Sequence, residues 1–292
     1  MSVIIDAQTR VLVQGITGQE GRFWTGHMLG LGTNVVGGVT PGKEGQEVEG
    51  VPVFDTVRRA TEEFEVDASL LFVPPRFARD AVYEALDAGI RTVVVLCEGI
   101  PVHDALRIRK AALLQNAMVI GGNTSGVIST GEAMMGFFPY WIERVYRPGR
   151  IGVMTRSGSL TNEVTAQIVE AGFGASTLVG IGGDSVPLTR FAEALPLFES
   201  DPGTDAVVII GELGGTMEEE VAEAIRNEIF TKPLVASLGG RTAPEGTKMG
   251  HAGAIVTAGM GTVEGKISAL EGAGALVADR PSNVGELLRE VV

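Results

Sequence analysis

The chain has little cysteine, no long apolar run and few aromatic residues, and these absences narrow the classes of protein it can belong to. Cys97 is the one cysteine among 292 residues, which excludes an intrachain disulfide and a zinc site built from cysteines. No apolar stretch is long enough to span a bilayer, and the first residues lack the basic start of a signal peptide, so we expect a cytoplasmic protein. The formal net charge of −13, without a polybasic run, disfavours nucleic acid and anionic membranes as partners.

Short apolar segments alternate with helical patterns along the chain. Hydrophobic residues make up 45% of the sequence, and its length predicts two packed domains. Continuous apolar strands separated by helices are typical of βαβ units around a parallel sheet that is buried on both faces. We therefore predict an α/β protein with two successive doubly wound domains. Strands are expected at 11–13, 34–36, 69–73, 93–96, 118–120, 151–154, 177–179, 206–210 and 234–236, with helices at 20–31, 77–88, 102–115, 161–171, 217–229, 263–271 and 283–292.

Residues 121–149 interrupt this alternation. They are rich in Gly, Ser and Thr, then in aromatic residues, and end at a Pro-Gly pair. We interpret this stretch as the crossing between the two domains.

A glycine-rich turn follows the first predicted strand, with Gly15, Gly18 and Gly21 in a G-x-x-G-x-x-G spacing. In an open α/β sheet such a turn places a phosphate against the free N–H groups of the next helix. Nicotinamide enzymes instead use G-x-G-x-x-G and an acidic residue after the second strand, where this chain has Pro41-Gly42-Lys43. A lysine there suits an additional phosphate, such as coenzyme A carries. A purely structural turn is the alternative at this point.

Three motifs in the second half indicate phosphoryl chemistry. His251 lies in the small-residue run 250–254, and an imidazole can accept a phosphoryl group on nitrogen and pass it on. Residues 157–159 follow a strand at a predicted helix start, where backbone N–H groups can hold an anion, although Ser157 fits a plain N-cap equally well. Glu212 ends a strand, and its carboxylate could hold one ring nitrogen of a histidine.

Other ionisable residues receive simpler interpretations. The acidic run Glu218–Glu220 opens a predicted helix, and we interpret it as a solvated helix start that the helix dipole favours. His27 and His103 fall in predicted helices and are interpreted as surface or packing residues.

Together these motifs resemble the α subunit of succinyl-CoA synthetase and, more broadly, the NDP-forming acid–CoA ligases. The resemblance implies a Rossmann-like CoA-binding domain over residues 1–125 and a flavodoxin-like ligase domain over residues 126–292 that carries a phosphohistidine loop. The matching motifs cover nearly the whole chain in order: Gln14–Gly18, Gly37–Lys43, Glu98–Pro101, Arg156–Gly158, Gly180–Asp184, Gly211–Glu212 and Gly250–Ala254.

The resemblance also implies a reversible reaction that makes an acyl-CoA from a carboxylic acid, CoA and ATP or GTP with Mg²⁺, through phosphorylation of His251. Glu212 would orient the ring. A separate ATP-grasp β subunit would bind most of the nucleotide, in an αβ or α₂β₂ assembly, so the chain alone is expected to be inactive. No metal site is expected in the chain itself. The implied phosphate-binding residues are Ser157, Gly158 and Ser159, and the implied CoA-binding residues are Thr17, Gly18, Gln19, Glu20, Lys43, Leu96, Cys97 and Glu98.

Two departures from the family pattern bear on the acid. The chain reads Asn123-Thr124-Ser125-Gly126 where the family usually has Asn-Cys-Pro-Gly, and Asn162 where it usually has tyrosine. The resemblance places both positions where the acyl group meets the CoA thiol, so Asn123, Thr124 and Asn162 are expected to line that pocket. Succinate, as in the tricarboxylic acid cycle, is the acid that the family suggests, with malate or citrate as alternatives. A CoA-binding regulatory protein and a nicotinamide-dependent oxidoreductase are the competing hypotheses.

Overall fold

The computed structural model describes residues 3–241, 250–256 and 261–292. Its contacts divide the chain into an N-terminal unit, Ile4–Phe138 with Val186–Thr189, and a C-terminal unit, Pro139–Ser185 with Arg190–Val292. The boundary after residue 125, which we predicted between the two functional domains, stays a prediction. Each unit is an α/β fold built on a largely parallel sheet, as the sequence predicts.

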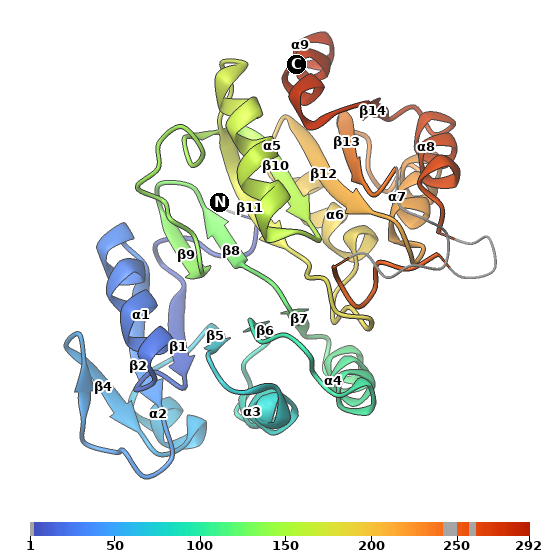
Figure 1. Ribbon diagram of the computed structural model, residues 1–292. Helices are drawn as coiled ribbons and strands as arrows, with labels where there is room; N and C mark the ends of the chain where they lie inside the picture. The colour runs from blue at the N-terminus through green and yellow to red at the C-terminus, as the bar shows by residue number, and fades with distance from the viewer. Residues whose placement is uncertain (1–2, 242–249, 257–260) are drawn as a thin grey trace. The chain divides into compact units, whose positions relative to one another are not determined.

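The N-terminal sheet has the strand order β3-β4-β2-β1-β5-β6-β7 (Figure 1). Apart from the short β3, which pairs with β4 in an antiparallel manner, this is the 3-2-1-4-5-6 order of Rossmann folds. The order reverses between β1 and β5, and ligands of such sheets bind at the carboxyl ends of the strands at this point. The strands are β1 (Arg10–Gln14), β2 (Asn34–Val39), β3 (Glu47–Val48), β4 (Val51–Phe54), β5 (Ala68–Leu71), β6 (Thr92–Val95) and β7 (Met118–Gly121).

Three helices of this unit end within one residue of their predicted ends, whereas the short helix Val57–Glu63 was not predicted. After α3, Gly89 adopts a φ of 93°, and the amide of Ile90 donates to the carbonyl of Ala85 at 3.0 Å, so the glycine terminates the helix. His27 and His103 lie in α1 and α4, as predicted. The helices are α1 (Gln19–Leu31), α2 (Val57–Glu63), α3 (Ala78–Asp87) and α4 (Val102–Leu114), with a short 3₁₀ turn at Pro75–Phe77.

The segment that we interpreted as a crossing contains a hairpin of β8 (Gly126–Ser129) and β9 (Ala133–Gly136). The two units do divide inside this segment, between Phe138 and Pro139, but its glycines do not mark a loop throughout. A Cβ at Gly126 would lie 2.0 Å from the Met135 carbonyl oxygen, and one at Gly136 would lie 1.9 Å from the Ser125 carbonyl oxygen. Glycine is therefore needed for the two strands to approach each other.

In the C-terminal unit the parallel strands run in the order β14-β13-β12-β10-β11. Read from β11, this is the 2-1-3-4-5 order of flavodoxin-like folds. The strands are β10 (Pro148–Thr155), β11 (Ala175–Gly180), β12 (Ala206–Glu212), β13 (Leu234–Gly239) and β14 (Leu276–Ala278), and the helices are α5 (Gly158–Glu170), α6 (Phe191–Ser200), α7 (Met217–Arg226), α8 (Val263–Glu271) and α9 (Val284–Val291). We did not predict α6, which holds Pro196, a residue that usually interrupts helices.

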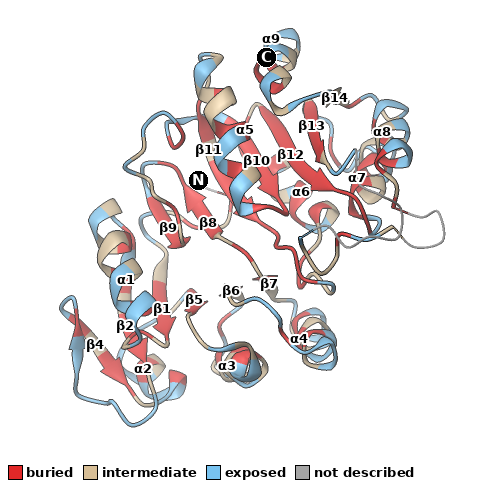
Figure 2. Ribbon diagram, viewed as in Figure 1, coloured by how far each residue is buried: buried red, intermediate tan, exposed pale blue. Residues whose placement is uncertain are grey.

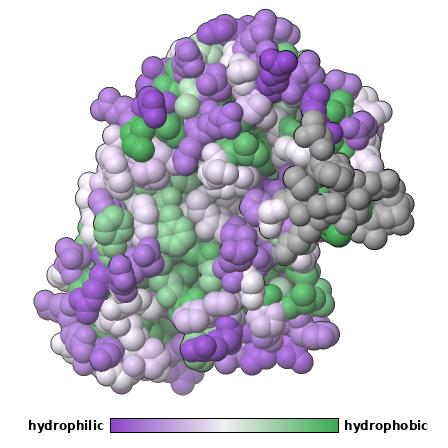
Figure 3. Space-filling view, in the orientation of Figure 1, coloured by the Kyte–Doolittle hydropathy of each residue, from purple (hydrophilic) through white to green (hydrophobic). Residues whose placement is uncertain are grey.

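The strands carry the core, as Figure 2 shows by the buried colour of β10, β12 and β13 against the exposed outer sides of the helices. Each residue from Val207 to Ile210 is fully buried, and each such side chain contributes about 1.5–3 kcal/mol to stability. On the face drawn in Figure 3, hydrophilic residues surround smaller hydrophobic patches. In the part of the chain that is described, no helix is both long and apolar enough to cross a membrane.

Candidate active site

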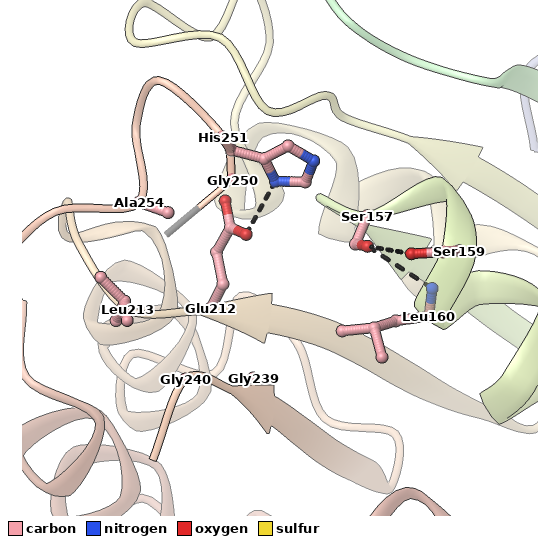
Figure 4. Close-up of a pocket in the computed structure, with 10 residues that line it drawn as sticks. All are labelled: Ser157, Ser159, Leu160, Glu212, Leu213, Gly239, Gly240, Gly250, His251 and Ala254. Carbon is pink, nitrogen blue, oxygen red and sulfur yellow. Dashed lines mark hydrogen bonds and ion pairs between the residues drawn. The ribbon is translucent and has the colours of Figure 1, made fainter. Parts of the chain in front are cut away.

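The carboxylate of Glu212 stands at the carboxyl end of β12, because this strand runs two residues beyond its predicted end. The Glu212 side chain is 10% exposed. Its Oε2 lies 2.8 Å from Nδ1 of His251, which the loop 250–256 brings to the same edge of the sheet (Figure 4). The two residues that the sequence singled out separately are thus in direct contact.

The imidazole of His251 packs against the backbone at Gly183, in the loop after β11. A Cβ at Gly183 would lie 2.5 Å from Cγ and 2.8 Å from Nδ1 of the ring, so this position admits only glycine without movement of the ring. The amide of Gly253 also donates to the Gly183 carbonyl at 3.3 Å. The ring is held between Glu212 and Gly183, and its second nitrogen points away from Glu212 in Figure 4.

The N-terminus of α5 lies beside this pair. Ser157 is its N-cap, and the Ser157 hydroxyl accepts from the amide of Leu160 at 3.4 Å and lies 3.3 Å from the Ser159 hydroxyl. The cap explains why α5 begins at Gly158, three residues before its predicted start. An N-cap satisfies one of the first-turn amides, and the others together with the helix dipole favour an anion.

These elements enclose a pocket of about 330 Å³ at the carboxyl edge of the C-terminal sheet. It unites four predicted site residues, Ser157, Ser159, Glu212 and His251, whereas Gly158 is not among the lining residues. Sequence reasoning missed Gly239 and Gly240 at the end of β13, although their position at a strand end was a usable signal. The lining residues are Ser157, Ser159, Leu160, Glu212, Leu213, Gly239, Gly240, Gly250, His251 and Ala254.

Arg156 and Glu218 contact Glu212 from inside the unit without lining the pocket, and the sequence analysis predicted neither contact. The Arg156 side chain is 3% exposed, and its Nη2 lies 3.2 Å from Oε1 of Glu212. Glu218 is fully buried and forms an ion pair with Lys266. The interpretation of Glu218–Glu220 as a solvated helix start was therefore wrong for Glu218, because α7 turns this residue toward β12.

A second pocket, of about 500 Å³, lies in the N-terminal unit at the carboxyl ends of β1, β2 and β5. Gly15 has a φ of 81°, and a Cβ there would lie 2.5 Å from the Phe72 carbonyl oxygen, so the turn requires glycine. Within the described residues no side chain caps α1 at Gly18, which leaves its first-turn amides for an anion. The pocket is lined by Gln14, Gly15, Gly18, Val39, Thr40, Pro41, Phe72, Val73, Pro74, Phe77, Asp80, Ala81 and Glu84.

The other predicted CoA-binding residues surround this turn to different degrees. The Thr17 hydroxyl donates to the Thr40 hydroxyl at 3.1 Å, and Gln19 and Glu20 occupy the exposed first turn of α1. Lys43 lies on an exposed loop two residues after Pro41. Leu96, Cys97 and Glu98 follow β6 at the same edge of the sheet but do not line the pocket.

The predicted acyl-pocket residues fall in both units. Asn123 has a φ of 54°, and its backbone N–H donates to the Cys97 carbonyl at 2.8 Å. The buried Thr124 hydroxyl accepts from the backbone N–H of Gly126 at 2.9 Å. Asn162 lies on the exposed side of α5, where its Oδ1 accepts from the Tyr146 hydroxyl at 2.5 Å. The shared pocket stays a prediction.

The Tyr146 phenol is buried, and this burial raises its pKa well above the ordinary value for tyrosine. The phenol therefore stays protonated and donates to Asn162. Among the described residues, no group of three or more His, Cys, Asp or Glu side chains is placed to hold a metal ion.

Comparison with known proteins matches both halves of the chain to described families. Residues 6–99 match the CoA binding domain family, and residues 154–276 match the CoA-ligase family. Over all of this chain and 98% of the relative, the sequence is 66% identical to the ADP-forming sulfoacetate-CoA ligase subunit SqwL of an Acholeplasma species. It is 64% identical over the full length of both chains to the corresponding subunit SauD of Bilophila wadsworthia.

Two further likenesses extend the comparison. The chain is 49% identical, over the full length of both, to a succinate–CoA ligase [ADP-forming] subunit alpha 2 of Archaeoglobus fulgidus. The ATP citrate lyase of Methanosaeta concilii superposes with a TM-score of 0.90 at 27% identity, and the match covers 99% of this chain and 50% of that one. The chain therefore belongs to the NDP-forming acid–CoA ligase family, as an acid–thiol ligase subunit related to succinate–CoA ligase α subunits.

Proposed function

We propose that this chain is the subunit of an ADP-forming acid–CoA ligase that carries the phosphoryl group on His251. The observation that supports this most directly is the 2.8 Å contact between Nδ1 of His251 and Oε2 of Glu212. A carboxylate at this distance accepts a hydrogen bond from Nδ1–H, so the proton stays on Nδ1 and the ring lone pair is on Nε2. The N-terminus of α5, with Ser157 and Ser159, lines the same pocket and is suited to the charge of a phosphoryl group.

The proposed reaction balances in three steps. Nε2 of His251 attacks the γ-phosphorus of ATP, an N–P bond forms, and the P–O bond to ADP breaks. A carboxylate oxygen of the acid then attacks this phosphorus, and the N–P electron pair returns to Nε2 as an acyl phosphate forms. The CoA thiolate finally attacks the acyl carbon and expels inorganic phosphate. Glu212 holds the Nδ1 proton throughout, and Ser157 and Ser159 stabilise the phosphoryl oxygens.

We propose that CoA occupies the N-terminal pocket. The uncapped first turn of α1 suits a diphosphate, and the apolar side chains of Phe72, Val73 and Phe77 suit a nucleotide base. Lys43 would reach an additional phosphate from its loop. A partner subunit with an ATP-grasp fold would supply ATP and Mg²⁺, in keeping with the relatives, which are named as subunits.

For the acid we propose sulfoacetate, with succinate as the second candidate. The identity of 66% and 64% to two sulfoacetate–CoA ligase subunits, against 49% to a succinate–CoA ligase subunit, supports this order. The Tyr146–Asn162 hydrogen bond suits an acid that carries a second anionic group, and it does not distinguish a sulfonate from a carboxylate. It occupies the amide oxygen of Asn162, so the amide N–H groups are left to donate to an anion such as a sulfonate.

The phosphorylation proposal is tested with the chain co-purified with its ATP-grasp partner and radiolabelled ATP. We expect a label that is stable in base and labile in acid, and that His251→Ala abolishes. His103→Ala, a matched change in α4, should keep it. A wild-type enzyme that takes no label, or a label that survives His251→Ala, would contradict the proposal and favour a regulatory CoA-binding role.

The acid is tested separately by comparing kcat/KM for sulfoacetate, succinate, malate and citrate with the reconstituted pair. We expect sulfoacetate to be preferred at least tenfold. Equal or better use of succinate would overturn the choice of acid without affecting the role of His251.

A further inference from the structure

A chain of buried charged side chains extends from Glu212 into the C-terminal unit. Nη2 of Arg156 lies 3.2 Å from Oε1 of Glu212, and its Nη1 lies 3.4 Å from Oε1 of Glu218. The other carboxylate oxygen of Glu218 pairs with Nζ of Lys266, which also lies 2.9 Å from Glu219. The side chains of Glu218 and Lys266 are fully buried, and that of Arg156 is 3% exposed.

A buried chain of ion pairs of this kind contributes little to the free energy of folding. Transfer of each ion out of water costs several kcal/mol, and apolar side chains of similar volume usually give equal or better stability. The sequence around these residues has no shortage of apolar side chains, since β12 is apolar from Ala206 to Ile210. The charges end on Glu212, the carboxylate that holds His251, which indicates a role in the site.

The geometry fixes Glu212 from two directions. Oε1 of Glu218 accepts from the backbone amide of Glu212 at 3.2 Å, so it holds the end of β12 itself. Arg156 pairs with Oε1 of the Glu212 side chain, and Nη1 of Arg156 donates to the Gly214 carbonyl at 3.1 Å. Oε1 forms an ion pair with the guanidinium without a hydrogen bond, and Oε2 is the oxygen that faces Nδ1 of His251.

Arg156 also lies against the loop that carries the histidine. A Cβ at Gly253 would come within 3.1 Å of Nη2 of Arg156, so the guanidinium and this loop are in close contact. Lys266 compensates the charge of Glu218, so the positive charge of Arg156 compensates that of Glu212.

We propose that Arg156 and Glu218 are positioning residues that fix the Glu212 carboxylate, so that His251 keeps its proton on Nδ1 and its lone pair on Nε2. Neither residue touches the transferred group in this assignment. The inference rests on the proposed function only where phosphorylation is the readout, because the ring tautomer can be measured without any substrate.

The test uses the full-length chain with ¹⁵N-labelled histidine, because its three histidines give resolvable ring-nitrogen signals. His251→Ala assigns the His251 signal, and His27 and His103 serve as internal references. We expect the Nδ1–H tautomer in the wild type, with a larger share of Nε2–H or exchange broadening in Arg156→Lys and Glu218→Gln. Arg190→Lys is the matched control, because Arg190 forms its ion pair with Glu220 on α7 and not with Glu212 or Glu218.

Phosphorylation with the partner subunit and ATP gives the second readout. In Arg156→Lys and Glu218→Gln we expect a 10- to 100-fold slower rate with an unchanged KM for CoA, on the order of what loss of one charge-assisted contact costs. Folded variants that keep both the wild-type tautomer and the wild-type rate would overturn the proposal. So would a wild-type His251 that carries its proton on Nε2.

Because single changes in a buried ion chain can prevent folding, the double variant Glu218→Gln/Lys266→Met is included. It removes one charge of each sign and is read by the same two measurements. If the His251 tautomer shifts in the variants but the wild-type protein takes no phosphoryl group, the positioning role stands and the proposed function fails. If the wild type is phosphorylated and the tautomer is unaffected in the variants, the positioning role fails alone.

Discussion

Gly183→Ala tests how firmly the imidazole of His251 is held, because it adds a single methyl group beside the ring. In the structure that methyl carbon would lie 2.5, 2.7 and 2.8 Å from three ring atoms. Ordinary contact begins near 3.4 Å, so the ring must move by about 0.9 Å unless the Gly183 loop gives way. A movement of that size takes Nδ1 out of hydrogen-bond range of Glu212, from which it is now 2.8 Å away.

The expected loss follows from that hydrogen bond. A hydrogen bond to a charged group contributes about 1.5–3 kcal/mol, which corresponds to a roughly 10- to 150-fold slower phosphorylation of His251. The assay is single-turnover labelling from ATP with the partner subunit, with circular dichroism to show that the fold is intact. Gly26→Ala is the control, since a Cβ there meets the Glu49 side chain at an ordinary 3.6 Å and should stabilise α1 by roughly 0.5–1 kcal/mol. A folded Gly183→Ala enzyme that is labelled at the wild-type rate would refute this account of how the ring is held.

Three further predictions address Glu212 and two ionisable groups. Glu212→Gln keeps the shape of the side chain but loses its charge, so it should slow His251 phosphorylation about 10- to 100-fold. Its affinity for CoA, measured by calorimetry, should stay unchanged. An unchanged rate of phosphorylation would show that Glu212 has no role in the site. Because burial raises the pKa of Tyr146, the folded chain releases this proton at a higher pH than the unfolded chain does. The free energy of unfolding should therefore fall as the pH rises above about 10, and it should fall less in Tyr146→Phe. Urea unfolding of both proteins at pH 8 and 10.5 measures this, and an equal loss of stability in the two would contradict the expectation. The Arg10 guanidinium lowers the pKa of Asp67, so the pair stabilises the fold above about pH 4 and loses this contribution as the pH falls further. Asp67→Asn should therefore have a modestly lower free energy of unfolding than wild type at pH 7, and the difference should vanish in acid. Urea unfolding at both pH values measures this, and a difference that does not change with pH would exclude the linkage.

The sequence by itself determined the two doubly wound sheets and the edge on which chemistry takes place. Apolar runs such as Val207–Ile210 read as buried strands, and helical patterns between them require parallel pairing. Since parallel strands end at one edge, Ser157 and Glu212 could be placed at that edge from the strand pattern, whereas only the family resemblance placed the loop of His251 beside them. Local pattern and topology point to the same answer, which is why the prediction of the fold class was confirmed.

Only the tertiary structure decided which side chains touch. Glu218 reads in sequence as one member of an exposed acidic run, yet the turn of α7 places it beneath β12, where Lys266, 48 residues later, neutralises it. The glycines of β8 and β9 read as loop signals, although they allow two backbones to approach. A contact such as that between His251 and Glu212 depends on strand register and loop packing to within about 1 Å, and neither quantity is encoded in local periodicity.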